Sequence, residues 1–164
     1  EEDHQVSVID TAKNEVIQRF EVGTRPRQAA FSPDGTRAYV TGELDGTVSI
    51  IDAINHEVTK TLKLAGAGVR PMEVDVSPDG RWAYVTTGRG GMVVAIDAET
   101  NTPARTVAVG QRPWGLALSP DGKRLYTANG PSNDVSIVDA ESFTVIATVP
   151  AGARPWGVVV VPLH

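Results

Sequence analysis

Short runs of apolar and β-branched residues alternate with turn-forming residues along the whole chain. Between residues 26 and 64 there are four such runs, at 28–31, 37–41, 47–51 and 58–64. Turn residues separate the runs about every 8–12 residues, and this spacing is typical of antiparallel strands. Because no stretch carries the period of an amphipathic helix, the pattern predicts an all-β protein.

Three separate sequence markers recur with one common period. Ser-Pro-Asp-Gly begins at residues 32, 77 and 119, which are 45 and then 42 residues apart. Arg-Pro pairs begin at Arg25, Arg70, Arg112 and Arg154. Apolar runs end at Asp10, Asp52, Asp97 and Asp139. The extra residues of the longer period fall within 65–69, so the chain repeats one unit of about 42 residues with one lengthened loop.

A period of about 40–45 residues that contains four antiparallel strands is typical of one blade of a β-propeller. Complete blades are predicted at residues 26–64, 71–109 and 113–149. The remaining segments predict an innermost strand near 155–161 and two outer strands within 5–22. Joined together, they would form a composite fourth blade without its second strand. The fold class is therefore an all-β propeller of four-stranded antiparallel blades, with about four repeats, and a half-propeller is one form of it.

The Ser-Pro-Asp-Gly motif is interpreted as a hairpin turn and not as a catalytic site. Pro33 sets φ for a type I turn, Asp34 can accept hydrogen bonds from its own backbone, and Gly35 supplies the left-handed residue. The serines at 32, 77 and 119 recur with the turn, which a catalytic serine has no reason to do. The aspartates that end the third strands recur in the same way. We therefore expect them to accept backbone N–H groups of the next turn.

The order of these motifs resembles that of the YVTN family of β-propeller repeats. The stretches that carry the resemblance are 38–41, 83–86 and 125–129. The C-terminal third is similar to the bacterial propellers associated with PQQ-dependent alcohol catabolism, through residues 109–114, 128–136 and 155–159. The resemblance implies a seven-bladed propeller in the periplasm or outside the cell, and it implies no defined activity.

The chain has too few residues for seven blades, which would need roughly 300. An open array of blades exposes apolar faces and sheet edges. Three arrangements would cover them: closure as a four-bladed ring, a homodimer that forms a larger ring, or completion by a missing propeller fragment. We expect association, because blades shaped for a wider ring must wedge sharply to close at four. An engineered or truncated fragment is a further interpretation.

Composition excludes several function classes. The net charge is −5, which argues against general nucleic-acid binding because that needs a basic face. The chain has no Cys, so disulfides, thiolate catalysis and cysteine-based zinc sites are excluded. No apolar run approaches the roughly 18 residues of a membrane-spanning helix. His4, His56 and His164 show no metal-ligand spacing, and no phosphate or dinucleotide fingerprint occurs, so no metal or cofactor is expected.

The four arginines of the Arg-Pro pairs are the candidate binding residues. In a propeller the loop before an innermost strand lies at one mouth of the central channel. Arg25, Arg70, Arg112 and Arg154 would then form a positive ring able to bind carboxylate or phosphate. Trp114 and Trp156 follow two of the pairs and could floor a ligand pocket. The alternatives are that each Arg pairs with an acidic group of a neighbouring blade or lies in solvent, and that the tryptophans plug the channel.

The sequence favours a non-enzymatic binding or assembly module over an enzyme. Nearly every distinctive residue is explained by the repeat, and no catalytic set of acids, bases or metal ligands stands out. The expected partners are a second copy of the chain or a missing propeller fragment, with a small anion as a further ligand. The alternative is a hydrolase of the lactonase kind with its site in the channel, which fold alone does not support.

Overall fold

The computed structural model describes residues 3–161, and these residues form fourteen strands and one short 3-10 helix. The strands are β1 (Gln5–Asp10), β2 (Glu15–Glu21), β3 (Pro26–Phe31), β4 (Arg37–Gly42), β5 (Thr47–Asp52), β6 (Glu57–Lys63), β7 (Val74–Val76), β8 (Trp82–Thr86), β9 (Met92–Asp97), β10 (Thr102–Ala108), β11 (Pro113–Leu118), β12 (Arg124–Asn129), β13 (Asp134–Asp139) and β14 (Thr144–Pro150). The 3-10 helix η1 spans Gly88–Gly90. Within residues 3–161 no helix is long and apolar enough to cross a membrane.

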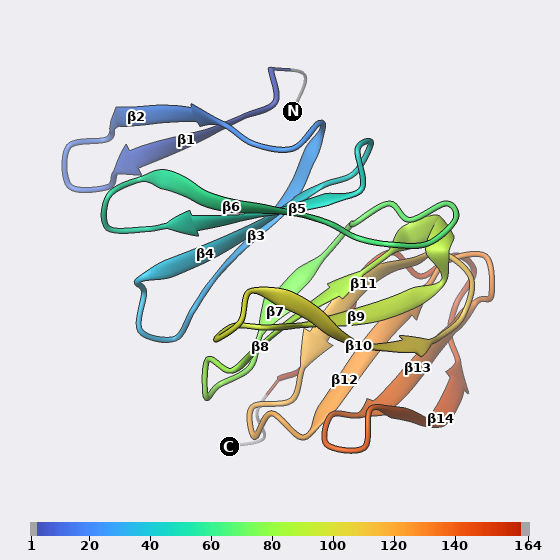
Figure 1. Ribbon diagram of the computed structural model, residues 1–164. Coiled ribbons are helices and arrows are strands. Elements are labelled where there is room, and N and C mark those ends of the chain that lie inside the picture. The colour runs from blue at the N-terminus through green and yellow to red at the C-terminus, as the bar shows by residue number, and fades with distance from the viewer. Residues whose placement is uncertain (1–2, 162–164) are drawn as a thin grey trace.

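The strands form three four-stranded antiparallel sheets and one two-stranded hairpin (Figure 1). We call β3–β6 blade 1, β7–β10 blade 2, β11–β14 blade 3, and β1–β2 the N-terminal hairpin. In each blade the chain runs outward from the first strand to the fourth, as the repeat predicts. The prediction of an all-β fold of four-stranded antiparallel blades is confirmed.

Apolar residues fill the spaces between neighbouring blades. Tyr39, Val48 and Ile50 of blade 1 pack against Val85 and Ile96 of blade 2. A second cluster joins blades 2 and 3, and a third joins the N-terminal hairpin to blade 1. Because each strand alternates its side chains between two neighbours, the core is a series of apolar layers along the array.

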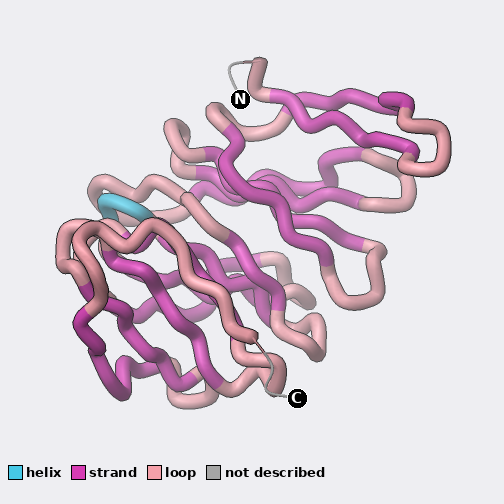
Figure 2. The backbone as a smooth tube through the Cα atoms, turned by 180° about the vertical axis from the view of Figure 1, so that it is seen from behind, coloured by secondary structure: helices cyan, strands magenta, loops and turns pink. Residues whose placement is uncertain are grey.

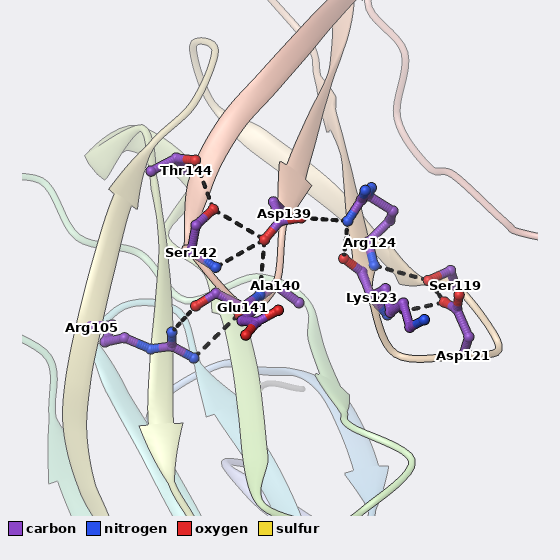
Figure 3. A network of polar contacts seen from close by, with 10 residues as sticks. All are labelled: Arg105, Ser119, Asp121, Lys123, Arg124, Asp139, Ala140, Glu141, Ser142 and Thr144. Atoms are coloured by element: carbon purple, nitrogen blue, oxygen red, sulfur yellow. Dashed lines mark hydrogen bonds and ion pairs between the residues drawn. The ribbon is translucent and has the colours of Figure 1, made fainter.

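The Ser-Pro-Asp-Gly segments form the expected hairpin turns. The Ser32 hydroxyl donates to the Asp34 carboxylate at 2.6 Å and accepts the Arg37 backbone N–H at 3.0 Å, while Gly35 has φ 71°. Figure 3 shows the same arrangement at Ser119 and Asp121, where the two oxygens lie 2.6 Å apart. All the polar groups of the motif serve the turn, which agrees with the structural interpretation of its serines.

The aspartates that end the third strands cap the next turn. Asp139 accepts the backbone N–H groups of Glu141 at 3.1 Å and Ser142 at 2.8 Å (Figure 3). Hydrogen bonds from Ser142 hold the pKa of Asp139 below its ordinary value, because they favour the charged carboxylate. Asp10, Asp52 and Asp97 accept equivalent bonds from their own turns. These four-fold repeated carboxylates are therefore turn caps.

The two ends of the array differ from the expectation. The N-terminal hairpin and the C-terminal segment lie at opposite ends of the molecule (Figures 1 and 2). Residues 155–161 were expected as an innermost strand, and this is wrong for the structure, where they carry no strand. The segment runs beside β11, so close that a Cβ on Gly115 would lie 2.7 Å from the Cα of Gly157. It takes the place of an inner strand without pairing, because none of the described strands lies beside it as a second strand. The composite fourth blade stays a prediction.

Candidate functional site

The Arg-Pro pairs lie at the start of β3 and β11, two residues before β7, and at the start of the C-terminal segment 155–161. Arg25, Arg112 and Arg154 have φ values of 58°, 50° and 50°, a left-handed conformation that costs a non-glycine residue about 1 kcal/mol. Side chains of the preceding turns hold two of them: the Arg25 N–H donates to His4 Nδ1 at 3.2 Å, and the Arg154 N–H to Asn133 Oδ1 at 2.8 Å. Arg70 follows the lengthened loop and instead donates its N–H to the Thr87 carbonyl at 2.9 Å.

Three of the four predicted arginines line one pocket of about 210 Å³ at the start of the inner strands. We call it the channel-mouth pocket. Arg25, Arg70 and Arg112 line it together with both predicted tryptophans, Trp114 and Trp156. The other residues of the lining are Arg27, Glu43, Met72, Gly88 and Arg89. Arg154 is exposed and does not line this pocket. The structure thus brings together five of the six predicted residues.

A buried carboxylate stands among the arginines. The Glu43 side chain is 10% exposed and faces three guanidinium groups from two blades. Its Oε2 lies 3.6 Å from Nε of Arg25 and 3.6 Å from Nε of Arg27, and its Oε1 lies 3.5 Å from Nη1 of Arg70. Pairing with an acid of the neighbouring blade, the alternative weighed for these arginines, therefore occurs at Arg70. Because five arginines and one carboxylate line the pocket, its lining is strongly positive.

The tryptophans form one wall of the pocket. The rings of Trp114 and Trp156 lie 4.4 Å apart at 35°, and the Arg112 guanidinium lies 5.3 Å from the centre of the Trp114 ring. Gly130 lies directly against Trp114, since a Cβ on this residue would come within 2.2 Å of the ring. The Arg112–Trp114 pair is a cation–π contact, and both residues line the channel-mouth pocket. Trp82 lies elsewhere, stacked on Arg105 at 4.4 Å.

Sequence reasoning missed Glu43 and Arg89 as pocket residues. The available signal was a break in the repeat. Glu43 stands where the other two blades have Gly88 and Gly130, after the second strand. In those blades the glycine makes room for Met72 and Trp114, whereas in blade 1 the carboxylate pairs with Arg27 at the matching place. A charged residue that replaces a repeated glycine was the clue.

Two further acidic residues lie at the inner strand of blade 2. Burial raises the pKa of Glu73, and the charge of Asp75 raises it further. Burial also raises the pKa of Asp75, although hydrogen bonds from the backbone N–H groups of Leu118, at 3.0 Å, and Val76, at 2.9 Å, oppose the change. Asp75 thereby ties the inner strands of blades 2 and 3 together. We therefore interpret Glu73 and Asp75 as structural residues of the inner strands.

The described residues hold no group of three or more His, Asp or Glu side chains placed to bind a metal ion. His4 and His56 occupy left-handed turn positions, with φ 56° and 57°. The third histidine of the chain, His164, lies outside the described residues.

Comparison with known proteins identifies the family. Residues 5–146 match the family described as lactonase, 7-bladed beta-propeller. The chain belongs to this lactonase propeller family. It is also similar in structure to Kuenenia stuttgartiensis hydrazine synthase, with a TM-score of 0.76 and 26% sequence identity over 87% of this chain. No curated protein matched.

The match to the lactonase propeller family agrees with the array of four-stranded blades. The similarity to hydrazine synthase covers 42% of that chain, so this lactonase-family chain spans less than half of the solved structure it matches. The match therefore supports the propeller architecture of the blades. Any function of the channel-mouth pocket has to be inferred from the residues that line it, because one fold can carry many functions.

Proposed function

We propose that this lactonase-family propeller is a binding module whose channel-mouth pocket takes a small anion attached to a flat or apolar body. The observation that carries the proposal is the meeting of five arginines and two neighbouring tryptophan rings around one pocket. This set is unexpected in a chain of net charge −5. A concentration of one charge sign in a concave site focuses the field on an oppositely charged ligand.

The two kinds of side chain recognise two parts of such a ligand. A guanidinium group offers paired N–H donors that match carboxylate or phosphate oxygens. A tryptophan ring offers a flat surface for stacking. The Arg70 side chain is about one-third exposed and Arg25 somewhat more, so both can turn toward a ligand while Glu43 stays buried behind them.

Tryptophan fluorescence provides a direct binding experiment. The purified chain is titrated with phenyl phosphate, and with inorganic phosphate to separate the contribution of the ring. We expect quenching at Trp114 and Trp156, with tighter binding of phenyl phosphate. R70A and R112A should each weaken binding at least about tenfold, the scale of one lost charge-assisted hydrogen bond.

Arg19→Ala is the matched control, because Arg19 is an exposed arginine of β2 that does not line the pocket. It should bind phenyl phosphate like the unmodified chain. Unchanged affinity of R70A and R112A for phenyl phosphate, or an equal loss in R19A, would show that the pocket is not the binding site. Binding would then come from general charge attraction.

Hydrolysis of a lactone is the second candidate, and the family match is what favours it. Arginines of the pocket could stabilise the oxyanion that forms when water attacks a lactone carbonyl. The water would need a base, and Glu43 is the carboxylate in the pocket lining. Guanidinium nitrogens of three arginines lie within 3.6 Å of its carboxylate oxygens. Turnover of model lactones that is lost in E43Q would support hydrolysis over binding alone.

We also propose a finer family assignment and a location for this chain. The Tyr-Val-Thr and Pro-Trp-Gly motifs support a YVTN-type propeller similar to those associated with PQQ-dependent alcohol catabolism. That resemblance supports a periplasmic or extracellular protein.

A further inference from the structure

Strand β1 has the sequence of a third blade strand but one unpaired edge. Its residues 6–10 read Val-Ser-Val-Ile-Asp, and residues 48–52 of β5 read Val-Ser-Ile-Ile-Asp. In blade 1, β5 pairs with β6 on one side and with β4 on the other. Among the described strands, β1 pairs with β2 alone. One row of its backbone N–H and C=O groups is therefore open to another strand.

An apolar pocket of about 240 Å³ adjoins this edge, between the N-terminal hairpin and blade 1. Six of its lining residues are Val6, Val8, Phe20, Ala29, Val40 and Ile51. The repeat matches them, in the same order, to Val48, Ile50, Leu62, Val74, Val85 and Ile96. Those six residues belong to the buried cluster between blades 1 and 2, which also contains Tyr39. The pocket has the lining of that cluster and lacks its tyrosine.

Tyrosines of the second strands fill this position at the other interfaces. Tyr39 is 0% exposed between blades 1 and 2, and Tyr84 is 2% exposed between blades 2 and 3. At the hairpin interface the neighbouring residue Phe31 is 63% exposed, whereas its counterpart Val76 packs on the core. A dry cavity of roughly 150 Å³ can hold a benzene ring, so the pocket has room for an aromatic side chain.

We propose that the free edge of β1 binds an extended strand of a partner polypeptide, with a tyrosine of that strand in the apolar pocket. The register follows from the complete blades. Tyr39 pairs with Ile50, and Tyr84 pairs with Ala95. The partner tyrosine therefore lies opposite Val8, antiparallel to β1. Main-chain hydrogen bonds supply affinity and the tyrosine supplies specificity, as in other strand-addition complexes.

The polar end of the pocket suits the tyrosine hydroxyl. At the next interface Arg37 donates to the Tyr39 hydroxyl at 3.4 Å and to Asn101 Oδ1 at 3.2 Å. The repeat places His56 at the position of Asn101, and His56 lines the apolar pocket. An imidazole there can accept or donate a hydrogen bond to the hydroxyl.

A separate polypeptide fits this position better than a second copy of the chain. The tyrosines of this chain lie on β4, β8 and β12, each already paired on both sides. The C-terminal segment, residues 151–161, contains no tyrosine. The partner strand therefore carries a small residue, a tyrosine, a β-branched residue and a threonine in that order, as the second strands of blades 1 and 2 do.

A peptide with the sequence of residues 35–43 tests the proposal, because it carries this pattern. Binding to the full chain is measured by fluorescence anisotropy of the labelled peptide, and backbone amide hydrogen exchange is followed in β1. We expect saturable binding and about tenfold slower exchange in residues 6–9. Replacing the peptide tyrosine by alanine should weaken binding at least about tenfold, and phenylalanine should retain most of it.

Filling the pocket tests the same site from the protein side. Ala29→Phe places a ring where the tyrosine would go, and we expect it to weaken peptide binding about tenfold. Ala104→Phe on the exposed face of β10 is the matched control and should bind normally. The alanine-substituted peptide keeps the test valid if A29F fails to fold. Equal affinity for the tyrosine and alanine peptides, or no protection of β1, would overturn the proposal. So would β1 amides that are already protected in a dimer of the chain alone.

Discussion

Glu43 controls the charge of the channel-mouth pocket at the residue scale. Its carboxylate is nearly buried and lies within 3.6 Å of guanidinium nitrogens from Arg25, Arg27 and Arg70. It plays two opposing parts. It screens the arginines from one another, which stabilises the fold, and it competes with any bound anion for the same donors.

E43Q separates these two parts. We expect phenyl phosphate to bind on the order of tenfold more tightly, because a competing negative charge is removed a few ångströms from the site. The free energy of unfolding should fall by about 1–3 kcal/mol, because three arginines lose their shared partner. Fluorescence titration and urea unfolding measure the two effects.

Glu99→Gln serves as the control for E43Q, since Glu99 is exposed in the turn after β9 and lies outside the channel-mouth pocket. It should change neither quantity measurably. Weaker anion binding in E43Q than in the unmodified chain would mean that Glu43 holds the arginines in their binding geometry and does not compete with the ligand.

At the scale of elements, the repeat predicts the strands well because each strand has its own local signals. The Pro-Asp-Gly turns and the terminal aspartates fix hairpins from short-range hydrogen bonds alone. The inner segment 155–161 has the composition of a strand, yet it lacks a neighbour to pair with, and strand formation depends on that neighbour. Local sequence could predict its place beside β11 but not its missing hydrogen bonds.

The channel-mouth pocket was predictable only in part, for a related reason. Arg25, Arg70 and Arg112 share a position in the repeat, so their meeting follows from the symmetry of the blades. Glu43 and Arg89 break the repeat, and their approach depends on how loops of neighbouring blades pack. Arg154 follows the repeat but lies past blade 3, and within residues 3–161 no further complete blade packs against it.

Gly130, directly after β12, leaves the space next to Trp114 in the wall of the channel-mouth pocket. A Cβ on this residue would come within 2.2 Å of the Trp114 ring, whereas a Cβ on Gly152 would meet no atom within 4 Å. G130A should therefore displace Trp114 and lower the free energy of unfolding by about 1–3 kcal/mol, the usual cost of overpacking. Denaturant unfolding and the tryptophan emission spectrum check this expectation, and G152A is the matched control. An unshifted spectrum in G130A would show that the Trp114 wall adapts.

At the scale of the whole molecule, the array of blades ends in two exposed apolar surfaces. Ile9 and Ile17 are exposed on the N-terminal hairpin, and at the other end Val159 and Val161 are 79% and 70% exposed. In the interior of the array the corresponding faces are covered by the next blade. Uncovered faces of this kind favour association, because burying them removes apolar area from water.

We propose that two copies associate end to end. The C-terminal segment of one copy takes the innermost place of the blade that contains the N-terminal hairpin of the other, and the place of the second strand, next to the edge of β1, stays open. Light scattering after size exclusion should then give roughly 35 kDa, twice the 17.4 kDa of the chain. Replacing Val159 and Val161 by Asp should return the mass to that of one chain, since two desolvated carboxylates would oppose the contact. Ile54→Asp, at an exposed apolar residue of the turn between β5 and β6, should leave the larger mass unchanged. A single-chain mass at every concentration would show that the apolar ends are tolerated in water, and the channel-mouth pocket would then be complete within one chain.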